Sequence, residues 1–528
     1  MRDATALGVP DVFNAATHFI DRHIGEGRGA KTAIECRDER VSYADLAARV
    51  NQLGRALRER LDVRREERVV LLLLDSPQFL YSFFGAIKIG AVPVPVNTLW
   101  TSADYRYLLA DTRARVVIVS AELAPKLAAI DAEHLPGVEH VVVIGEPANS
   151  FDGRARTWRW TDLVAGVATE LDPVATSRDE AAFWLYSSGS TGRPKGCVHL
   201  QHDMVVCAEL FAKGVLGANE NDRFFSVPKL FFAYGLGNAG YFPLAVGGTS
   251  ILWAGPPTAA NVYATIEQHR PTLFFSVPTG YGMLLAQPGT FDLSSVRLAS
   301  SAGEALPPAL YERFKQRFDV DILDGIGSTE ALHTFISNRP GAIRPGSSGL
   351  IVPGYDAKVV DDDGVPVASN EMGDLWVAGD SVCAGYWNQH EKTKHTIHGQ
   401  WIRTGDKYTR DADGYYWYAG RSDDMLKVGG LWVSPIEVEH ALLQHAAVQE
   451  CAVVAREDHD ALVKPEAFIV VKDGHEPTPA LADDLLRHVR ARLADYKRPR
   501  WIEFVPELPK TATGKIQRHR LRGSRTSV

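Results

Sequence analysis

The chain of 528 residues is poor in cysteine, and the arrangement of its cysteines argues against two kinds of site. An odd number without a CxxC pair disfavours a disulfide framework and a thiolate zinc site. We therefore expect reduced thiols, as in cytoplasmic proteins. The five cysteines stand singly, at Cys36, Cys197, Cys207, Cys383 and Cys451.

Long apolar runs and excess positive charge are also missing. The best apolar run, residues 69–74, has the length of a strand rather than of a membrane span. The N-terminal segment has neither the cationic start nor the continuous apolar core of a signal peptide. A net charge of −8 gives no general footprint for nucleic acid. We expect a cytoplasmic protein that binds neither membrane nor nucleic acid.

Two familiar motifs are absent: the GxxxxGK[ST] loop of P-loop NTPases and the HExxH of zinc proteases. His199 and His202 stand three residues apart, as do His395 and His398. Without a supporting context, these pairs indicate solvated or capping histidines more than metal ligands.

The composition, 45% hydrophobic and 23% charged, is typical of a globular protein, and the length indicates several domains. Between about residues 30 and 150, short apolar runs alternate with helical patterns, which predicts a parallel sheet covered by helices. The pattern resumes from 181 to about 324. The predicted strands are 69–75, 92–97, 116–120, 141–145, 181–185, 249–253, 273–277, 298–302 and 320–323, and the predicted helices of the first part are 77–90 and 102–111.

The texture changes at about residue 346. Turn pairs such as Asp363-Gly364 and Asp413-Gly414 separate short alternating runs at 357–360, 374–378 and 415–419, which predicts an antiparallel sheet or a distorted barrel. The charged, glycine-flanked segment 420–430 then indicates a hinge. A smaller α/β unit follows, with helices at 435–444 and 479–494 and strands at 448–455 and 466–471.

The segment 186–196, YSSGSTGRPKG, is the most informative part of the sequence. Its glycines let backbone N–H groups approach phosphate oxygens, its hydroxyls can donate, and its Arg and Lys offset charge. It follows an apolar strand, as loops that hold nucleotide phosphates do in α/β proteins.

Other segments could complete a nucleotide pocket. SAGEA at 301–305 has a glycine against which a flat base could pack, and DGIGSTE at 324–330 ends in a carboxylate that could hold Mg²⁺ beside phosphates. Thr404-Gly405-Asp406 offers a carboxylate to a ribose diol. PKTATGKI at 509–516 presents Lys515 on a loop. Taken singly, these segments are also ordinary turns, caps or solvated charges.

Six motifs in this order, YSSGSTGRPKG, SAGEALP, DGIGSTE, RTGD, GRSDDMLKVGG and PKTATGKIQR, resemble the core motifs of the acyl-adenylate-forming superfamily. The likeness extends from about residue 10 to 522. SVPKLFFAYGLGNAG at 226–240 and ALHTFISN at 331–338 are similar to benzoate–CoA ligases in particular.

The resemblance implies an α/β fold with two domains. The large N-terminal domain, 1–422, would contain two parallel-type α/β subdomains and a distorted β-barrel. A small mobile α+β domain, 423–528, would rotate about Asp423. The implied reaction joins a carboxylate to AMP from Mg-ATP and then transfers the acyl group to CoA. Rotation makes physical sense because Lys515, needed for the first step, would obstruct the thiol in the second.

The resemblance also assigns roles by position. The phosphate loop would comprise Ser187, Ser188, Gly189, Ser190, Thr191, Gly192 and Lys195. The adenine would lie against Gly303, Glu304, Ala305, Asp324, Gly325 and Ile326. Thr329 would contact the α-phosphate and Glu330 the metal. Asp406 would hold the ribose hydroxyls, with Arg421 on the ribose–phosphate side. Lys515 would bridge the carboxylate and the α-phosphate, and after rotation Lys427, Gly430 and Trp432 would help to form the pantetheine tunnel. Ile326 departs from the aromatic residue of many relatives, so stacking on adenine would be weaker.

The acid pocket implied by the resemblance is short and aromatic, which suits a ring of the size of benzoate. An amino acid would need a carboxylate for its ammonium, and the segment FFAYGLG has none. His333 could donate to a ring hydroxyl, so hydroxy- and aminobenzoates are alternatives, and Tyr234 and His333 could also be core residues. The pocket residues are Ala233, Tyr234, Tyr281, Gly327, His333 and Ile336.

Three further matters stay open at this level. The acceptor could be a carrier protein or oxygen instead of CoA, and the chain could be a regulatory nucleotide-binding protein without catalysis. Retention of both Glu330 and Lys515 argues against the latter, because simple binding needs neither. Partners compatible with the family are a second copy of the chain in a homodimer, and a lysine acetyltransferase and deacetylase acting on Lys515.

Overall fold

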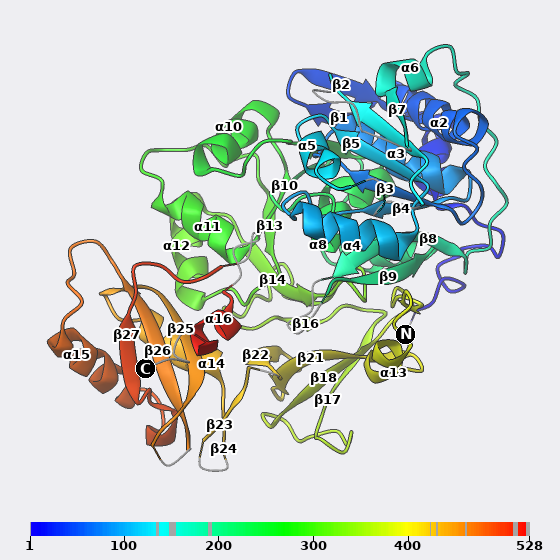
Figure 1. The fold of residues 1–528 in the computed structure, drawn as a ribbon. Helices are drawn as coiled ribbons and strands as arrows, with labels where there is room; N and C mark the ends of the chain where they lie inside the picture. Colours follow the sequence, from blue (N-terminus) through cyan, green and yellow to red (C-terminus); the bar gives the residue numbers. More distant parts are fainter. Residues whose placement is uncertain are drawn as a thin grey trace.

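The computed structural model in Figure 1 describes residues 2–131, 133, 137–146, 155–187, 193–422, 424–428, 431–459, 462–510 and 516–523. Within these residues, the side chains of Lys427, Leu431, Trp432, His519 and Gly523 are not described.

The first α/β unit is built on a five-stranded parallel sheet in the order β4-β3-β5-β6-β7. Val69 and Val116 point into one core and Val70 and Val117 into another, so β3 and β5 are buried on both faces. This double burial explains why these strands are continuous apolar runs in the sequence. The strands are β3 (Arg68–Leu72), β4 (Val92–Pro95), β5 (Val116–Ser120), β6 (His140–Ile144) and β7 (Arg156–Arg159).

Helices cover both faces of this sheet. Residues of α2 and α3 belong to the core on one face, and residues of α4 and α5 to the core on the other. Thr101 and Asp104 form a reciprocal capping box that starts α4, as Ser42 and Asp45 do for α2. The helices are α2 (Tyr43–Arg60), α3 (Pro77–Lys88), α4 (Ser102–Thr112), α5 (Ala124–Ala128) and α6 (Trp160–Val164), preceded by a π-helical turn (Thr17–Asp21) and α1 (Arg22–Gly25).

The second unit is a nine-stranded sheet in the order β16-β15-β14-β13-β12-β10-β11-β1-β2. Its central strands are parallel, and β2, β15 and β16 run antiparallel at its ends. The strands are β1 (Thr32–Cys36), β2 (Glu39–Ser42), β10 (Arg223–Ser226), β11 (Thr249–Leu252), β12 (Leu273–Ser276), β13 (Leu298–Ser301), β14 (Ile322–Gly327), β15 (Thr334–Ser337) and β16 (Leu350–Ile351).

The helices of this second unit include two π-helical segments that continue short α-helices. They are α7 (Asp203–Cys207) with Ala208–Lys213, α8 (Ala233–Gly235) with Leu236–Tyr241, α9 (Phe242–Val246), α10 (Ala259–His269), α11 (Pro278–Ala286) and α12 (Pro308–Phe318).

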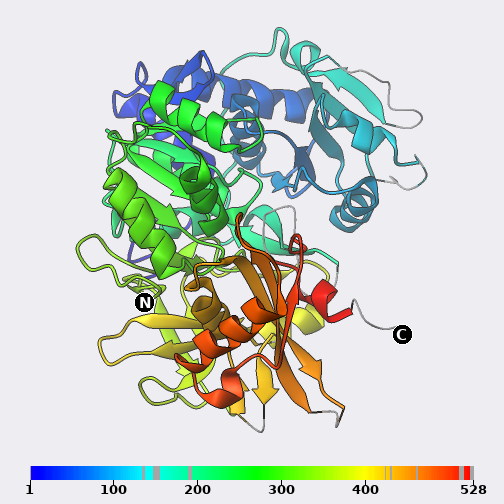
Figure 2. The ribbon, with the colours of Figure 1, turned by 90° about the vertical axis from the view of Figure 1, so that its left-hand side faces the viewer.

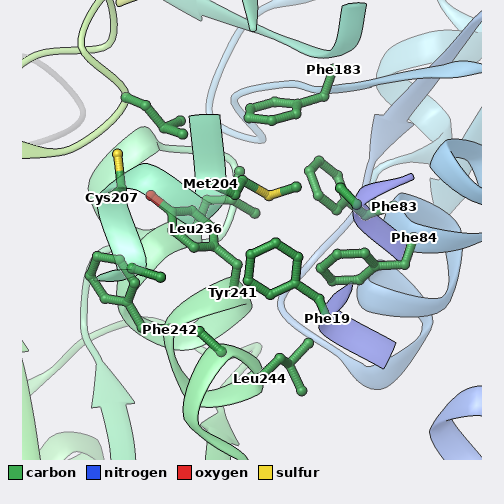
Figure 3. Packing of buried hydrophobic residues seen from close by; sticks show 14 of the residues in the cluster. Phe19, Phe83, Phe84, Phe183, Met204, Cys207, Leu236, Tyr241, Phe242 and Leu244 are labelled. Atoms are coloured by element: carbon green, nitrogen blue, oxygen red, sulfur yellow. The ribbon is translucent and has the colours of Figure 1, made fainter. Parts of the chain in front are cut away.

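A shared aromatic core joins the two α/β units. Figure 3 shows Phe84 of α3 beside Phe19, and Tyr241 of the second unit on the other side of Phe19. The ring centroids of Phe19 lie 5.9 Å from Phe84 and 6.1 Å from Tyr241, which is the spacing of favourable aromatic pairs. The two units therefore pack as one body.

Antiparallel strands make up the rest of the large domain. One sheet has the order β19-β9-β8, and another contains β17-β18-β21-β20 with β22 paired to β21. The strands are β8 (Ala181–Ser187), β9 (Lys195–Leu200), β19 (Gly385–Tyr386), β17 (Asp356–Val360), β18 (Met372–Ala378), β20 (Ile397–His398), β21 (Trp401–Arg410) and β22 (Tyr416–Arg421), with α13 at His390–Thr396.

The C-terminal unit has a core of its own, in which Val438 and Leu442 of α14 pack with Val453 of β25 and Leu485 of α15. Figure 2 shows this unit, orange to red, against the yellow strands of the large domain, where α14 contacts β22. Its elements are β23 (Leu426–Val428), β24 (Leu431–Val433), α14 (Pro435–Leu443), β25 (Val448–Glu457), β26 (Val463–Val471), α15 (Pro479–Arg490), a 3₁₀ turn (Asp495–Lys497), β27 (Trp501–Phe504) and α16 (Arg518–Gly523).

The predicted mixture of parallel α/β units, an antiparallel region and a small α+β unit is confirmed, with one corrected boundary and two further details. The last long helix ends at Arg490, not at 494. The predicted hinge segment 420–430 contains the end of β22 and the strand β23, which pairs with β24. The DGIGSTE segment begins inside β14 and leads into β15, so it is not a helix N-terminus.

All five cysteines are free thiols, as predicted. Across the described ranges, none of the helices combines the length and the apolar character needed to cross a bilayer.

Candidate active site

The predicted phosphate loop joins two antiparallel strands. Ser187 at the end of β8 and Lys195 at the start of β9 are register partners, so the two ends of the loop lie side by side. The loop therefore belongs to a β-hairpin and does not open a helix, unlike the loop of P-loop NTPases. Ser188, Gly189, Ser190, Thr191 and Gly192 lie outside the described residues.

A carboxylate, an ammonium and a phenol meet beside this hairpin. Lys195 Nζ lies 3.1 Å from Glu330 Oε1, and the Tyr386 hydroxyl donates to the same oxygen at 2.7 Å. Lys195 also donates to the Tyr386 oxygen at 2.6 Å, and Ser187 Oγ lies 3.4 Å from Glu330 Oε1. Burial raises the pKa of Glu330, but the Lys195 charge and the Tyr386 hydrogen bond outweigh it and hold the pKa below its usual value. Glu330 is therefore an anion at neutral pH.

The segment that carries Glu330 is a tight connection between β14 and β15. A Cβ at Gly327 would lie 2.5 Å from His333 O, so only glycine fits there. Ser328 Oγ accepts a hydrogen bond from Ala331 N, and Thr329 O accepts one from Leu332 N. The close approach brings Thr329 and Glu330 next to the residues predicted for the acid pocket.

The predicted adenine residues lie in one loop and on strand β14, and a carboxyl connects the two. Asp324 of β14 accepts a hydrogen bond from Leu306 N at 3.2 Å, which ties the loop containing Gly303, Glu304 and Ala305 to β14. Asp324 is 4% exposed, and burial raises its pKa to about 8 despite hydrogen bonds that lower it. Gly325 is buried on β14, and Ile326 is half-buried and packs against the main core.

Asp406 and Arg421, predicted for the ribose side, form an ion pair. They are register partners on β21 and β22, and Arg421 Nη1 lies 3.1 Å from Asp406 Oδ1. Gly405 has a φ of 76° and a Cβ there would lie 2.8 Å from the Arg421 guanidinium, so the glycine admits this contact. Asp406 therefore lies inside a strand rather than in the alternative β-turn.

His333 and Tyr234 form one wall of the predicted acid pocket. His333 Nε2 lies 3.3 Å from Tyr234 O and 3.2 Å from Asn238 Oδ1, so this nitrogen carries the proton and donates. Burial lowers the pKa of His333 to about 3, and the ring is neutral. A Cβ at Gly237 would lie 2.3 Å from His333 Cδ2, so glycine makes room for the imidazole.

Ser300 links the two tyrosines predicted for this pocket. The Tyr234 hydroxyl donates to Ser300 Oγ at 3.1 Å and the Tyr281 hydroxyl to Ser300 O at 2.7 Å. Tyr281 is fully buried in a neighbouring core. Ala233 is half-buried, and Ile336 lies on β15 in the main core. Aromatic and uncharged groups thus surround His333.

Several C-terminal predictions cannot be placed. Lys515, Asp423 and Gly430 lie outside the described residues. Lys427 and Trp432 are register partners in the β23–β24 hairpin, as judged from their backbone.

Sequence reasoning missed Tyr386, whose only local signal is its place in the GYW run that begins at Gly385. It also mistook His199 and His202, which are buried rather than solvated or capping. Apolar neighbours in the sequence, such as Met204 to Val206, could have indicated their burial. His395 and His398 are exposed, as predicted.

Comparison with known proteins gives a consistent result. Residues 21–387 match the family model of the AMP-binding enzyme, and residues 437–515 match the AMP-binding enzyme C-terminal domain. A benzoate–CoA ligase of Thauera aromatica is 49% identical over 98% of this chain and 97% of its own length. A 4-hydroxybenzoate–CoA/benzoate–CoA ligase of Rhodopseudomonas palustris is 45% identical over 97% of this chain and 94% of its own. The solved structure of the anthranilate CoA ligase AuaEII in complex with anthranoyl-AMP is 47% identical, with a TM-score of 0.92 over 98% of both chains.

Proposed function

The chain belongs to the AMP-binding enzyme family, and we propose that it is an AMP-forming ligase that converts benzoate to benzoyl-CoA with ATP. In the first step a carboxylate oxygen of the acid attacks the α-phosphorus of ATP, and pyrophosphate leaves. In the second step the thiol sulfur of CoA attacks the acyl carbon of the adenylate, AMP leaves, and the thiol proton is released.

The observation that carries this proposal is the closeness of acid and phosphate residues in one short segment. Gly327 and His333 are predicted for the acid pocket, and Thr329 and Glu330 lie between them in the chain. Because β14 and β15 pair on either side, this connection is compact. An acid held by the first pair would reach an α-phosphate held by the second, and such positioning lowers the barrier of a two-substrate step.

Glu330 fits a role in holding Mg²⁺ together with ATP. The described portion of the chain contains no group of three or more His, Cys, Asp or Glu side chains that could bind a metal ion by themselves. Mg²⁺ commonly takes one or two carboxylates plus phosphate oxygens, which a single anionic carboxylate suits. Held there by Glu330, the ion would offset the negative charge of the phosphates. Lys195, paired with Glu330, would add positive charge at the hairpin.

A neutral aromatic wall supports benzoate as the acid. His333 is uncharged, and Phe211, Phe242 and Tyr234 have ring centroids 4.5 to 5.3 Å from it. Such walls favour offset or edge contacts with a flat ring.

Hydroxy- and aminobenzoates are the second candidates. In the described part of the structure, His333 Nδ1 and Asn238 Nδ2 are buried without a hydrogen-bond partner. A polar ring substituent could satisfy one of them. The relatives named for 4-hydroxybenzoate and anthranilate are compatible with this candidate.

Pyrophosphate release tests the function. With ATP and benzoate we expect release that depends on the acid, and with CoA added we expect AMP and benzoyl-CoA in equal amounts. Release without acid, or adenylate that transfers to a phosphopantetheine carrier but not to CoA, would contradict the proposal. A panel of substituted benzoates compared by kcat/KM would then rank the candidates.

We further propose two domains, 1–422 and 423–528, with Asp423 as the hinge. The separate core of the C-terminal unit and the two family matches on either side of this boundary support it. We also propose that Lys515 acts in adenylation, that an acetyltransferase and deacetylase control it, and that the protein works in the cytoplasm, with a homodimer as its assembly. Gel filtration with light scattering tests the homodimer.

A further inference from the structure

His199 is a buried histidine that bridges two elements beside the site. Its Nε2 lies 2.8 Å from Thr329 O, and its Nδ1 lies 2.8 Å from Asp203 Oδ2. The side chains of His199 and Asp203 have no exposed surface. The ring of Phe183 stacks on His199 with centroids 5.1 Å apart, and Phe183 and Met204 belong to the core of Figure 3. The imidazole is thus fixed on its face and at both nitrogens.

The hydrogen-bond partners determine how the protons are arranged. Thr329 O is a carbonyl and can only accept, so Nε2 carries a proton and donates to it. Nδ1 faces an Asp203 oxygen that already accepts from Leu200 N. The Asp203 carboxyl therefore orients the ring from the side opposite Thr329.

A second histidine supports Asp203 from the other side. His202 Nε2 lies 3.3 Å from Asp203 Oδ1 and 3.0 Å from Asp380 O, and its Nδ1 lies 2.9 Å from Arg178 O. Burial lowers the pKa of His202, but Asp203 and these carbonyls outweigh it and raise the pKa overall. Asp203 therefore lies between two imidazoles, with a hydrogen bond to His199 and a 3.3 Å contact to His202.

The segment that His199 contacts needs external support. Leu332 has a φ of 67°, in the left-handed region that side chains other than glycine rarely adopt, and it is fully buried. Three consecutive carbonyls before it are bound from outside the segment. His199 Nε2 donates to Thr329 O, Cys383 N to Glu330 O at 2.7 Å, and Ser381 Oγ to Ala331 O at 2.8 Å.

Strand β9 supports this segment twice. Lys195 and His199 are four residues apart on β9, so their side chains leave the same face of the strand. Lys195 pairs with the Glu330 carboxylate, and His199 donates a hydrogen bond to the backbone carbonyl of Thr329. Strand β9 therefore fixes both the Glu330 side chain and the Thr329 backbone, in the two residues predicted to contact the metal and the α-phosphate.

We propose that His199, oriented by Asp203, is a positioning residue for acid adenylation. It holds the Thr329 carbonyl so that the Thr329 hydroxyl and the Glu330 carboxylate keep the geometry that the α-phosphate and its metal require. This inference rests on the proposed function, since it concerns the first half-reaction of that activity.

Two isosteric variants test the proposal. His199→Gln places an amide nitrogen near the position of Nε2, where it can still donate to Thr329 O. His199→Asn places one near Nδ1, where it can reach Asp203 but not Thr329. We expect benzoate-dependent exchange between pyrophosphate and ATP to lose about tenfold or more in kcat in the Asn variant and clearly less in the Gln variant. The KM for benzoate, and thioester formation from added benzoyl adenylate, should change less than about threefold.

The control is His269→Gln. His269 is a buried histidine whose Nδ1 lies 2.8 Å from Glu35 Oε2, and Glu35 lies on β1, several strands from β14. It should keep the exchange rate within about twofold. Thermal melting of all three variants separates a loss of folding from a loss of positioning.

Equal kcat in the Gln and Asn variants at equal stability would overturn the proposal, as would an equal loss of both half-reactions. If both variants melt far below the native protein, Asp203→Asn gives the deciding exchange measurement, because it keeps the imidazole and weakens its orientation. An unchanged exchange rate in that variant would reject the role. Absence of exchange in the native protein would instead reject the proposed function.

Discussion

Two carboxyl groups of the candidate site differ in charge, one anionic and one neutral, because their neighbours differ. Glu330 accepts from Lys195 and Tyr386, and its pKa is held below the usual value. Asp324 is buried with a hydrogen bond from Leu306 N but without a paired cation among its described contacts, and its pKa rises to about 8. A neutral Asp324 suits contact with an uncharged base, and an anionic Glu330 suits a metal.

Asp324 makes stability depend on pH in a defined direction. Its pKa is about 8 in the folded protein and about 4 in an unfolded chain. Its contribution to stability is therefore complete below about pH 4 and is lost as the pH rises through about 8. Asp324→Asn removes this dependence. Relative to the native protein, we expect the variant to gain on the order of 2 kcal/mol between pH 6 and pH 8 without nucleotide, as measured by urea unfolding.

The control is Asp222→Asn. Asp222 is buried and paired with Arg297, and its pKa is lowered, so its charge does not change between pH 6 and pH 8. It should destabilise the protein equally at both values. The same pH slope in the native protein and in Asp324→Asn would show that Asp324 is not the group responsible.

At the scale of the element, helix α4 supports both strands of the β8–β9 hairpin, which carries the predicted phosphate loop. On the β8 side, the Tyr186 hydroxyl donates to Asp111 Oδ2 at 2.5 Å. On the β9 side, the Tyr107 hydroxyl donates to Pro194 O at 3.0 Å, and Arg193 lies over the Tyr107 ring. The first α/β unit therefore fixes where the hairpin begins and ends, although its own sheet carries none of the predicted site residues.

Loss of this support should weaken ATP binding more than acid binding. We expect Tyr107→Phe to raise the KM for ATP about two- to fivefold, since one hydrogen bond contributes about 1 kcal/mol. The KM for benzoate should stay within about twofold. Tyr105→Phe on the same helix is the matched control, because its hydroxyl donates to Asn97 O instead. Similar KM values for ATP in both variants would refute this supporting role.

At the scale of the whole molecule, the C-terminal unit has the internal packing that the proposed rotation about Asp423 requires. It has its own core, and Arg518 is paired with Glu439 at 2.8 Å inside it. A unit with an independent core can change its orientation without unfolding. This property agrees with the proposal that one face serves adenylation and another serves thioester formation.

Lys515→Ala tests the proposed alternation. We expect adenylation to fall by two orders of magnitude or more, because a cation that offsets charge in the transition state is lost. Thioester formation from added benzoyl adenylate should remain largely intact, and a sample acetylated at Lys515 should behave alike. Lys510→Ala is the control, because Lys510 lies in the same segment as Lys515 but is paired with Glu450 at 2.7 Å. An equal loss of both half-reactions, or full adenylation in the acetylated sample, would reject the respective proposal.

The sequence predicted the elements of the sheets closely where both faces of a strand are buried. Residues 116–120 were predicted as a strand and form β5, because a continuous apolar run is a strong local signal. Helix α15 was predicted four residues too long, because residues 491–494, Ala-Arg-Leu-Ala, are good helix formers. In the structure the helix ends at Arg490, and a 3₁₀ turn begins at Asp495. The burial of His199 was misjudged because it depends on tertiary contacts with Phe183 and Thr329. Neither contact produces a local pattern in the sequence around His199.

By itself the sequence determined the family, the order of the elements and the set of motifs that bear the chemistry, since these follow from local composition and spacing. Only the tertiary structure decided which of these groups meet. Lys195, Glu330 and Tyr386 are separated by 135 and 56 residues and converge on one oxygen because strands β8, β9 and β19 pair beside the β14–β15 connection. The charge of each carboxyl follows from that convergence, because burial and neighbouring charges, and not residue type, set its pKa.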